Sequence, residues 1–406
     1  MPFSSRRWLL LAAISPLSLL GLAPARADQA DAFNFSLSQG WQHDDNLFRL
    51  SPQMLSVYKQ AGRKTSDDQS TTSLIAMVDK TYSLQRLRAK LSYNLVRYQR
   101  NSYLDYNGHA YDAGWDWRIG KRFSGTVSWN SSESQSSFAD MAAVKNINRR
   151  TSRSISANYW FHPDWTIGAS ATGSESSNPS AVQKTSDFRS HGHEFLVRYT
   201  PRSGNSLDLA VRESNGRYPN RQVVAGVSTV DNSYIEKVAE LRGNWQLSGL
   251  SRISFRAGQT KRQHDEVSAR NFKGFTGNLS WDWQPTGKLA FKTSARREIG
   301  ATDDTTANYV VTTAYSFMPV WSLSAKSSVQ GRLERTERSY GGDPVTAFSG
   351  AEKRNDTIQL IGLSASWAPD TALMFSAYAN REKRKSNMAN SDYRDTTVGV
   401  SAQFSF

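Results

Sequence analysis

Apolar and polar residues alternate along most of the chain. Leu289 and Ala295, for example, fall on one side of the alternation, while Lys292 and Arg296 fall on the other. Residues 321 to 334 show the same alternation and are predicted to form one strand. A period of two gives a β-strand one apolar and one polar face. The pattern predicts an all-β chain, but by itself it does not decide between a soluble sandwich and a membrane barrel.

Short turns and longer polar loops alternate strictly. Proline and glycine set turn dihedrals and stop strand pairing, so they mark the turns. Eight short turns and nine longer segments give seventeen connections, which join eighteen strands. An even strand number, with short turns at one end and long loops at the other, is typical of bacterial outer-membrane barrels. The predicted short turns are 83–85, 120–122, 162–164, 201–205, 248–250, 284–287, 318–320 and 368–370.

Aromatic residues decide between the sandwich and the barrel. They gather within a few residues of the short turns, as expected of rings at a membrane interface, whereas a sandwich core would not confine them to strand ends. The sequence therefore predicts a transmembrane antiparallel up-and-down β-barrel of about 18 strands. The predicted girdle contains Trp117, Phe123, Phe161, Trp165, Tyr199, Trp245, Trp283, Phe317, Trp321 and Trp367.

The last strand carries a separate signal. Val398, Val400, Ala402, Phe404 and Phe406 alternate up to a terminal phenylalanine. This pattern resembles the C-terminal signal of proteins that the barrel assembly machinery inserts into the outer membrane. We therefore expect this machinery and the lipid bilayer to be partners of the chain.

The first 27 residues have the pattern of a secretory signal peptide. Arg6 and Arg7 precede an apolar run, and Ala25-Arg26-Ala27 follows it. The run is shorter than the ~20 residues that a membrane-spanning helix needs. We predict a cleaved signal peptide at residues 1–27, a single barrel domain at residues 28–406, and export to the outer membrane of a Gram-negative bacterium.

The composition limits which kinds of partner the chain can bind and which chemistry it can perform. The net charge is +14, and without a basic tail or a nucleic-acid motif this balance fits an anionic polymer or lipid headgroup better than nucleic acid. The chain has no cysteine, which excludes disulfides and Cys-ligated metals. We predict no nucleic-acid partner and no cofactor.

Candidate catalytic and metal-ligating groups are sparse. The six histidines have no nucleophile-elbow sequence nearby. His191 and His193 alternate onto one strand face beside Glu194, but one pair is too few for a zinc site. Asp44-Asp45-Asn46 and Asp303-Asp304 lack the glycine and distal glutamate of an EF-hand loop. The sequence predicts neither an enzyme nor a metal site.

The polar strand faces supply a candidate lumen. Inward acids on neighbouring strands pair with part of the basic set, yet the excess is positive and would favour anions. Trp160 and Tyr378 are candidate rings for stacking on sugars. The predicted inward cations are Arg86, Arg88, Lys90, Arg118, Arg198, Arg212, Arg242, Arg252, Arg256, Lys292, Arg296, Lys326 and Arg332, of which Arg212 is the one not assigned to the binding lumen.

The first strand ends in a recognisable motif, Asp44-Asp45-Asn46-Leu47-Phe48-Arg49, three residues after Trp41. It resembles the opening strand of the EpsL-like exopolysaccharide biosynthesis proteins, which are outer-membrane barrels. The resemblance implies a role in making or exporting a surface polysaccharide, with the polymer crossing the lumen and with periplasmic polysaccharide export proteins as separate partners.

Two alternatives stay open at this point. The chain could be a general or anion-selective diffusion porin, a class in which one long loop usually folds into the bore, and residues 336–354 are the candidate for that loop. It could instead be a non-conducting barrel that anchors a surface-secretion system. The sequence does not separate these functions.

Overall fold

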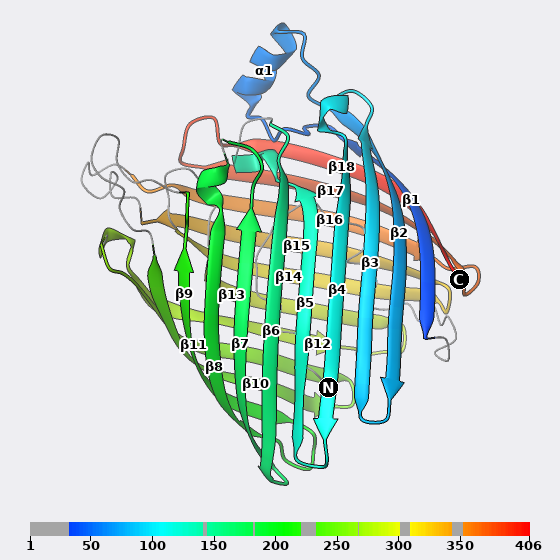
Figure 1. Ribbon diagram of the computed structural model, residues 1–406. Helices are drawn as coiled ribbons and strands as arrows, with labels where there is room; N and C mark the ends of the chain where they lie inside the picture. Colours follow the sequence, from blue (N-terminus) through cyan, green and yellow to red (C-terminus); the bar gives the residue numbers. More distant parts are fainter. Residues whose placement is uncertain are drawn as a thin grey trace.

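Alternating strands close into a barrel in the computed structural model, which describes residues 32–406 except 141–143, 182, 221–232, 267, 301–308 and 343–351. Within these residues a single 18-stranded sheet is formed, as predicted. Figure 1 shows β1–β9 crossing in front of β10–β18. The strands are β1 Phe33–Asp44, β2 Asp67–Tyr82, β3 Gln85–Tyr98, β4 Tyr106–Ile119, β5 Phe123–Gln135, β6 Ile147–His162, β7 Trp165–Ser177, β8 Phe188–Tyr199, β9 Ser206–Arg217, β10 Tyr234–Ser248, β11 Ser251–His264, β12 Phe272–Trp283, β13 Leu289–Gly300, β14 Tyr309–Ser324, β15 Ser327–Gly341, β16 Asn355–Trp367, β17 Leu373–Ser386 and β18 Tyr393–Ser405.

The first and last strands close the sheet on itself. β1 is hydrogen-bonded to β2 on one side and to β18 on the other, always antiparallel. At the seam the Phe35 and Phe406 main chains exchange two hydrogen bonds of 2.8 Å, and the two rings stack with centroids 6.0 Å apart. A closed ladder leaves no strand edge unpaired, which is the condition for crossing a bilayer as a sheet.

One of the predicted short turns is wrong. Residues 318–320 lie inside the continuous strand β14, and the chain turns instead at Ala325 and Lys326. The same turn divides the predicted strand 321–334 into the end of β14 and the start of β15. The alternation of apolar and polar residues continues across the turn without a change of phase, so it gave no sign that one strand ends there and another begins.

The strand tolerates a proline here because its pairing is locally interrupted. Proline cannot donate a ladder hydrogen bond, and the pairing of β14 with β15 jumps from Phe317 opposite Leu333 to Val320 opposite Gln330. Gly331 leaves room for the proline ring, since a Cβ at this glycine would lie 3.0 Å from Pro319 Cγ.

A helix stands in the connection between β1 and β2, where the sequence predicted only a polar loop. This helix, α1 (Pro52–Gln60), rises above the rim of the barrel (Figure 1). Ser51 caps it by accepting a hydrogen bond from the Met54 amide at 3.2 Å, and proline occupies the first turn. One-turn 3-10 helices lie at Ser102–Leu104, Phe138–Asp140, Lys184–Ser186 and Ser268–Arg270. Among the described residues, no helix has the length and apolar character to span a bilayer.

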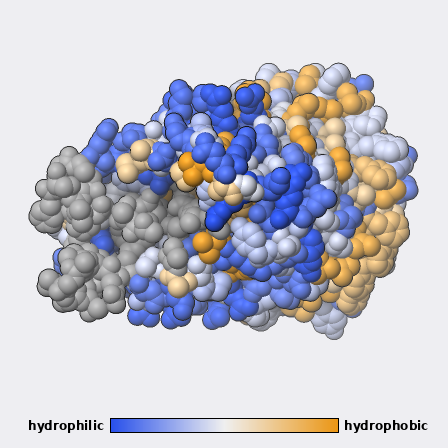
Figure 2. Space-filling model, turned by 90° about the horizontal axis from the view of Figure 1, so that it is seen from above, coloured by the Kyte–Doolittle hydropathy of each residue, from blue (hydrophilic) through white to orange (hydrophobic). Residues whose placement is uncertain are grey.

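The outer wall carries an apolar belt. Large side chains such as Leu241, Phe275, Leu279, Ile361 and Leu363 point outward and are exposed. Figure 2 shows apolar residues gathered over one part of the wall, with hydrophilic residues beside them. Members of the predicted aromatic girdle lie on this outer surface near the short turns, among them Trp165, Trp283, Trp321 and Trp367. Hydrocarbon is the environment that such a belt fits.

Candidate functional site

The polar faces of the strands meet inside the barrel and form the candidate site. Strand parity places the predicted residues of β3, β4, β8, β10, β11, β13 and β15 inward, and also places Trp160 on β6 and Tyr378 on β17 inward. Lys326 is the exception. It lies in the turn after β14, where its ammonium donates to the Pro369 carbonyl, so its predicted place on a strand face is wrong.

Ion pairs cover the inward face of β8–β11. Arg198 binds Asp208 through two hydrogen bonds of 2.7 Å. Arg242 contacts both Glu194 and Glu240, and Glu240 also lies 3.7 Å from Arg256. Glu240 is only 3% exposed, so its charge requires cationic partners such as these guanidinium groups.

The chain of charges continues over β13 and β15. Arg296 lies 3.4 Å from Glu298 and 4.0 Å from Glu334, and Arg332 pairs with Glu334 at 2.7 Å. We call the inward face of β8–β15 the charged wall. Two further predicted cations, on β3, are also paired: Arg86 with Asp79 and Arg88 with Asp116.

Besides Lys326, four predicted lumen cations form no ion pair with a described carboxylate: Lys90, Arg118, Arg252 and Lys292. Arg252 instead donates to the Gln246 side chain at 2.9 Å. Arg118 and Arg252 lie near the short turns, and Lys292 is three residues into β13. The positive excess of the lumen is therefore smaller than the count of arginines and lysines suggests.

The inward face of β5–β7 has a different composition, and we call it the hydroxyl wall. Ser128 and Ser154 hydrogen-bond across the strands at 2.7 Å, and Asn130 accepts from Ser152. Thr126 donates to Asp116 at 2.9 Å. Tyr378, farther round the barrel, donates to the Gln42 side chain at 2.6 Å, which leaves its ring in the lumen. These side chains offer donors and acceptors without net charge.

The motif that ends β1 builds the mouth at the long-loop end. Arg49 lies 2.9 Å from both Asp44 and Asp395, and Asn46 donates to the Leu50 and Arg394 carbonyls. Burial lowers the pKa of Arg49, but the two carboxylates outweigh it and raise the pKa above its ordinary value. The motif residues therefore fix the loop to β18.

A connection missed by sequence reasoning crosses this mouth. The Ala139 carbonyl, between β5 and β6, accepts a hydrogen bond from Arg384 on β17, although β4, β3, β2, β1 and β18 separate the two strands along the wall. Phe138 packs edge-on against Phe48 at 5.2 Å. The described part of this inward connection is residues 136–140 and 144–146. Of the earlier loop candidate, 336–354, residues 336–341 belong to β15, and residues 343–351 lie outside the described part of the chain.

Apolar side chains anchor this connection. Leu47 and Phe48 of the motif and Phe138 of the connection share a buried cluster with the inner face of β3. The cluster narrows the mouth on the side of β1–β5. Its buried members are Leu47, Phe48, Val96, Tyr98, Leu104 and Phe138.

Among the described residues, one group of carboxylates could hold a metal ion, and an arginine already contacts it. Asp303 and Asp304 lie outside the described residues. Asp44, Asp45 and Asp395 place carboxylate oxygens within 4.8 Å of one another, but Arg49 already lies between two of them. His191 and Glu194 fall on opposite faces of β8, with Glu194 inward.

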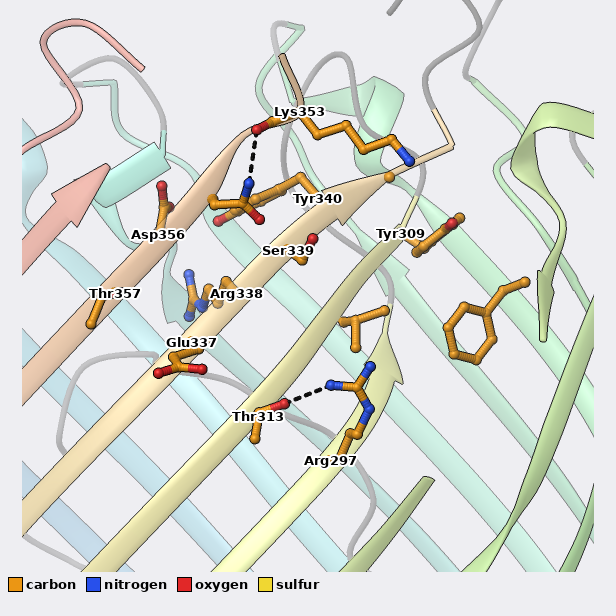
Figure 3. A pocket seen from close by; sticks show the side chains of 14 residues that line it. Arg297, Tyr309, Thr313, Glu337, Arg338, Ser339, Tyr340, Lys353, Asp356 and Thr357 are labelled. Atoms are coloured by element: carbon orange, nitrogen blue, oxygen red, sulfur yellow. Dashed lines mark hydrogen bonds between the residues drawn. The ribbon is translucent and has the colours of Figure 1, made fainter. Parts of the chain in front are cut away.

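A polar pocket lies outside the lumen site, on the long-loop ends of β13–β16. Figure 3 shows Arg297 donating to Thr313, at 2.9 Å, and Glu337 and Arg338 on the adjacent strand. The lining carries charges of both signs, so it has no clear preference for cations or anions.

Belt, girdle and lumen together define a porin-like membrane barrel, with an apolar outside and a polar inside. Residues 246–406 match the family model described as "Putative beta-barrel porin 2". No curated protein matches the sequence.

Solved structures with a similar fold are outer-membrane proteins. OpdK from Pseudomonas aeruginosa aligns with a TM-score of 0.49 at 12% identity, over 92% of this chain and 99% of that chain. OccK9 (OpdG) from the same organism aligns with a TM-score of 0.48 at 10% identity, over 92% of this chain and 98% of that chain. The siderophore receptor PirA from P. aeruginosa aligns with a TM-score of 0.45 at 9% identity, over 93% of this chain and 80% of that chain. These likenesses concern the fold alone.

Proposed function

We propose that the barrel is a passive outer-membrane conduit for a hydroxyl-rich polymer, a surface polysaccharide. The observation that carries the proposal is the lining of the lumen. The hydroxyl wall offers many weak hydrogen bonds, and the charged wall neutralises most of its own arginines. Such a lining suits a neutral or weakly acidic saccharide chain better than a strongly anionic one, because each contact is readily exchanged with water.

Two further features support this cargo. Trp160 and Tyr378 are inward rings, and the flat faces of sugars stack on aromatic side chains. The Asp44 to Arg49 motif resembles that of exopolysaccharide barrels, for which periplasmic export proteins would deliver the polymer. The terminal strand ending in Phe406 would direct assembly by the barrel assembly machinery.

A general diffusion porin is the second candidate, favoured by the family model that matches residues 246–406. Planar-bilayer recording with the purified barrel separates the two. A polysaccharide conduit conducts ions and shows transient blocks on adding oligosaccharides, with longer dwell times for longer chains. A diffusion porin passes small sugars in liposome swelling but gives no length-dependent blocks, an outcome that contradicts the proposal. A silent membrane would favour a structural barrel and would also overturn it.

A further inference from the structure

An apolar groove crosses the outer wall over the seam strands. It is formed by β15–β18 and β1, with Leu323 of β14 at its edge. Its lining includes the small side chains of Ala365, Ala377 and Ala402, which lie among larger ones such as Trp41 and Trp367. The depression between these side chains gives room for a chain of hydrocarbon.

The same strands change from apolar to basic toward the long-loop end. On the outer face of β17, Ala377 and Ala379 are followed by Arg381 and Lys383, and Lys383 pairs in register with Arg394 of β18. Arg381 and Arg394 are exposed, and Lys383 is half-buried. Four residues along a strand span ~13 Å, so the groove and the cations lie within the length of one lipid molecule.

Several other cations on the outer wall are ion-paired. Arg149 pairs with Glu133, Lys237 with Glu213 at 3.1 Å, and Arg335 with Glu337 at 2.8 Å. By contrast, no described carboxylate forms an ion pair with Arg381, Lys383 or Arg394. An uncompensated cluster just beyond an apolar belt is complementary to anionic headgroups.

We infer that this surface binds a phosphorylated glycolipid of the outer leaflet, with its phosphates on Arg381, Lys383 and Arg394 and an acyl chain in the groove. Arginine can hold a phosphate oxygen pair through its fork of donors, while lysine adds a point charge. The bound lipid would cover the seam at which β18 meets β1 and would stabilise barrel closure.

Native mass spectrometry of the full barrel, with bisphosphorylated lipid A and its dephosphorylated form as probes, tests this inference. The wild type should retain the phosphorylated lipid and bind the dephosphorylated form at least tenfold more weakly. Each cation near an anionic headgroup strengthens binding roughly fivefold. The triple variant R381Q/K383Q/R394Q should therefore weaken binding by about a hundredfold. Ala377→Trp, which fills the groove without altering charge, should weaken binding of both lipids.

The matched control, R149Q/K237Q/R335Q, removes the same charge from the ion-paired outer cations and should retain binding within about twofold. Heat-modifiable migration on gels verifies that each variant is folded. An equal loss of lipid binding in the control variant would show that binding depends on net charge alone, and it would overturn the proposed site. Equal binding of the two lipid forms by the wild type would overturn the phosphate contact, and an unaffected Ala377→Trp variant would overturn the groove.

Discussion

The hydroxyl wall and the charged wall occupy different arcs of the same lumen and satisfy their polar groups by different means. On β5–β7, side chains such as Ser128 and Ser154 pair by neutral hydrogen bonds that water can replace. On β8–β15, Glu240 is buried between Arg242 and Arg256. Neutral pairs contribute little and cost little to break, whereas a buried charge without its partner is strongly destabilising. The lumen therefore has one wall whose hydrogen bonds can be exchanged for bonds to water or solute, and one wall whose side chains are held by ion pairs.

The largest expected effect comes from breaking the charged wall at its most buried carboxylate. Glu240→Gln keeps the shape of the side chain but removes the charge that faces Arg242 and Arg256. Arg242 retains Glu194, while Arg256 loses its ion pair. We expect a loss of about 3 kcal/mol in the free energy of unfolding.

Urea titration of the folded, heat-modifiable species measures this loss. Glu213→Gln is the control on the same sheet, because Glu213 pairs with Lys237 on the outer face, where both side chains are at least a third exposed. It should cost well under 1 kcal/mol. Equal losses in the two variants would show that burial does not distinguish the charged wall.

A pair of double variants distinguishes lumen cations that set ion selectivity from lumen cations that stabilise the charged wall through ion pairs. Arg252 and Lys292 have no ion pair with a described carboxylate, whereas Arg256 and Arg296 do. R252Q/K292Q should shift the reversal potential in a salt gradient toward cations and leave the urea midpoint unchanged. R256Q/R296Q should lower the urea midpoint as well. If both doubles behave alike in urea, the ion pairs contribute nothing to stability.

Strand number and closure could be predicted from the sequence because they follow from local patterns. A period of two and the spacing of turns are read from neighbouring residues, and they gave the 18-stranded barrel and the facing of Arg242 and Arg256. The turn at 318–320 was wrong because Pro319 marks a turn by itself, yet Gly331 on the partner strand makes room for it.

Contacts made by closure could not be predicted in the same way. Arg242 on β10 meets Glu194 on β8, two strands away, and this diagonal contact depends on the relative register of three strands, which no local pattern reveals. The contact of Arg384 with the Ala139 carbonyl requires the whole ring of strands to exist first. Helix α1 did have a local signal, the Ser51-Pro52 pair, which is typical of a helix start.

The smallest effect is expected on the hydroxyl wall. The Ser128 and Ser154 hydroxyls bond across β5 and β6 at 2.7 Å. Removing both together leaves no polar group without a partner, so S128A/S154A should change the free energy of unfolding by less than about 1 kcal/mol. Its effect should appear in transport instead. Two exchangeable contacts are lost, so oligosaccharide blocks in bilayer recordings should shorten while ion conductance stays the same. Unchanged block durations would mean that sugars do not use this wall, and a large loss of stability would mean that the two walls do not differ as described.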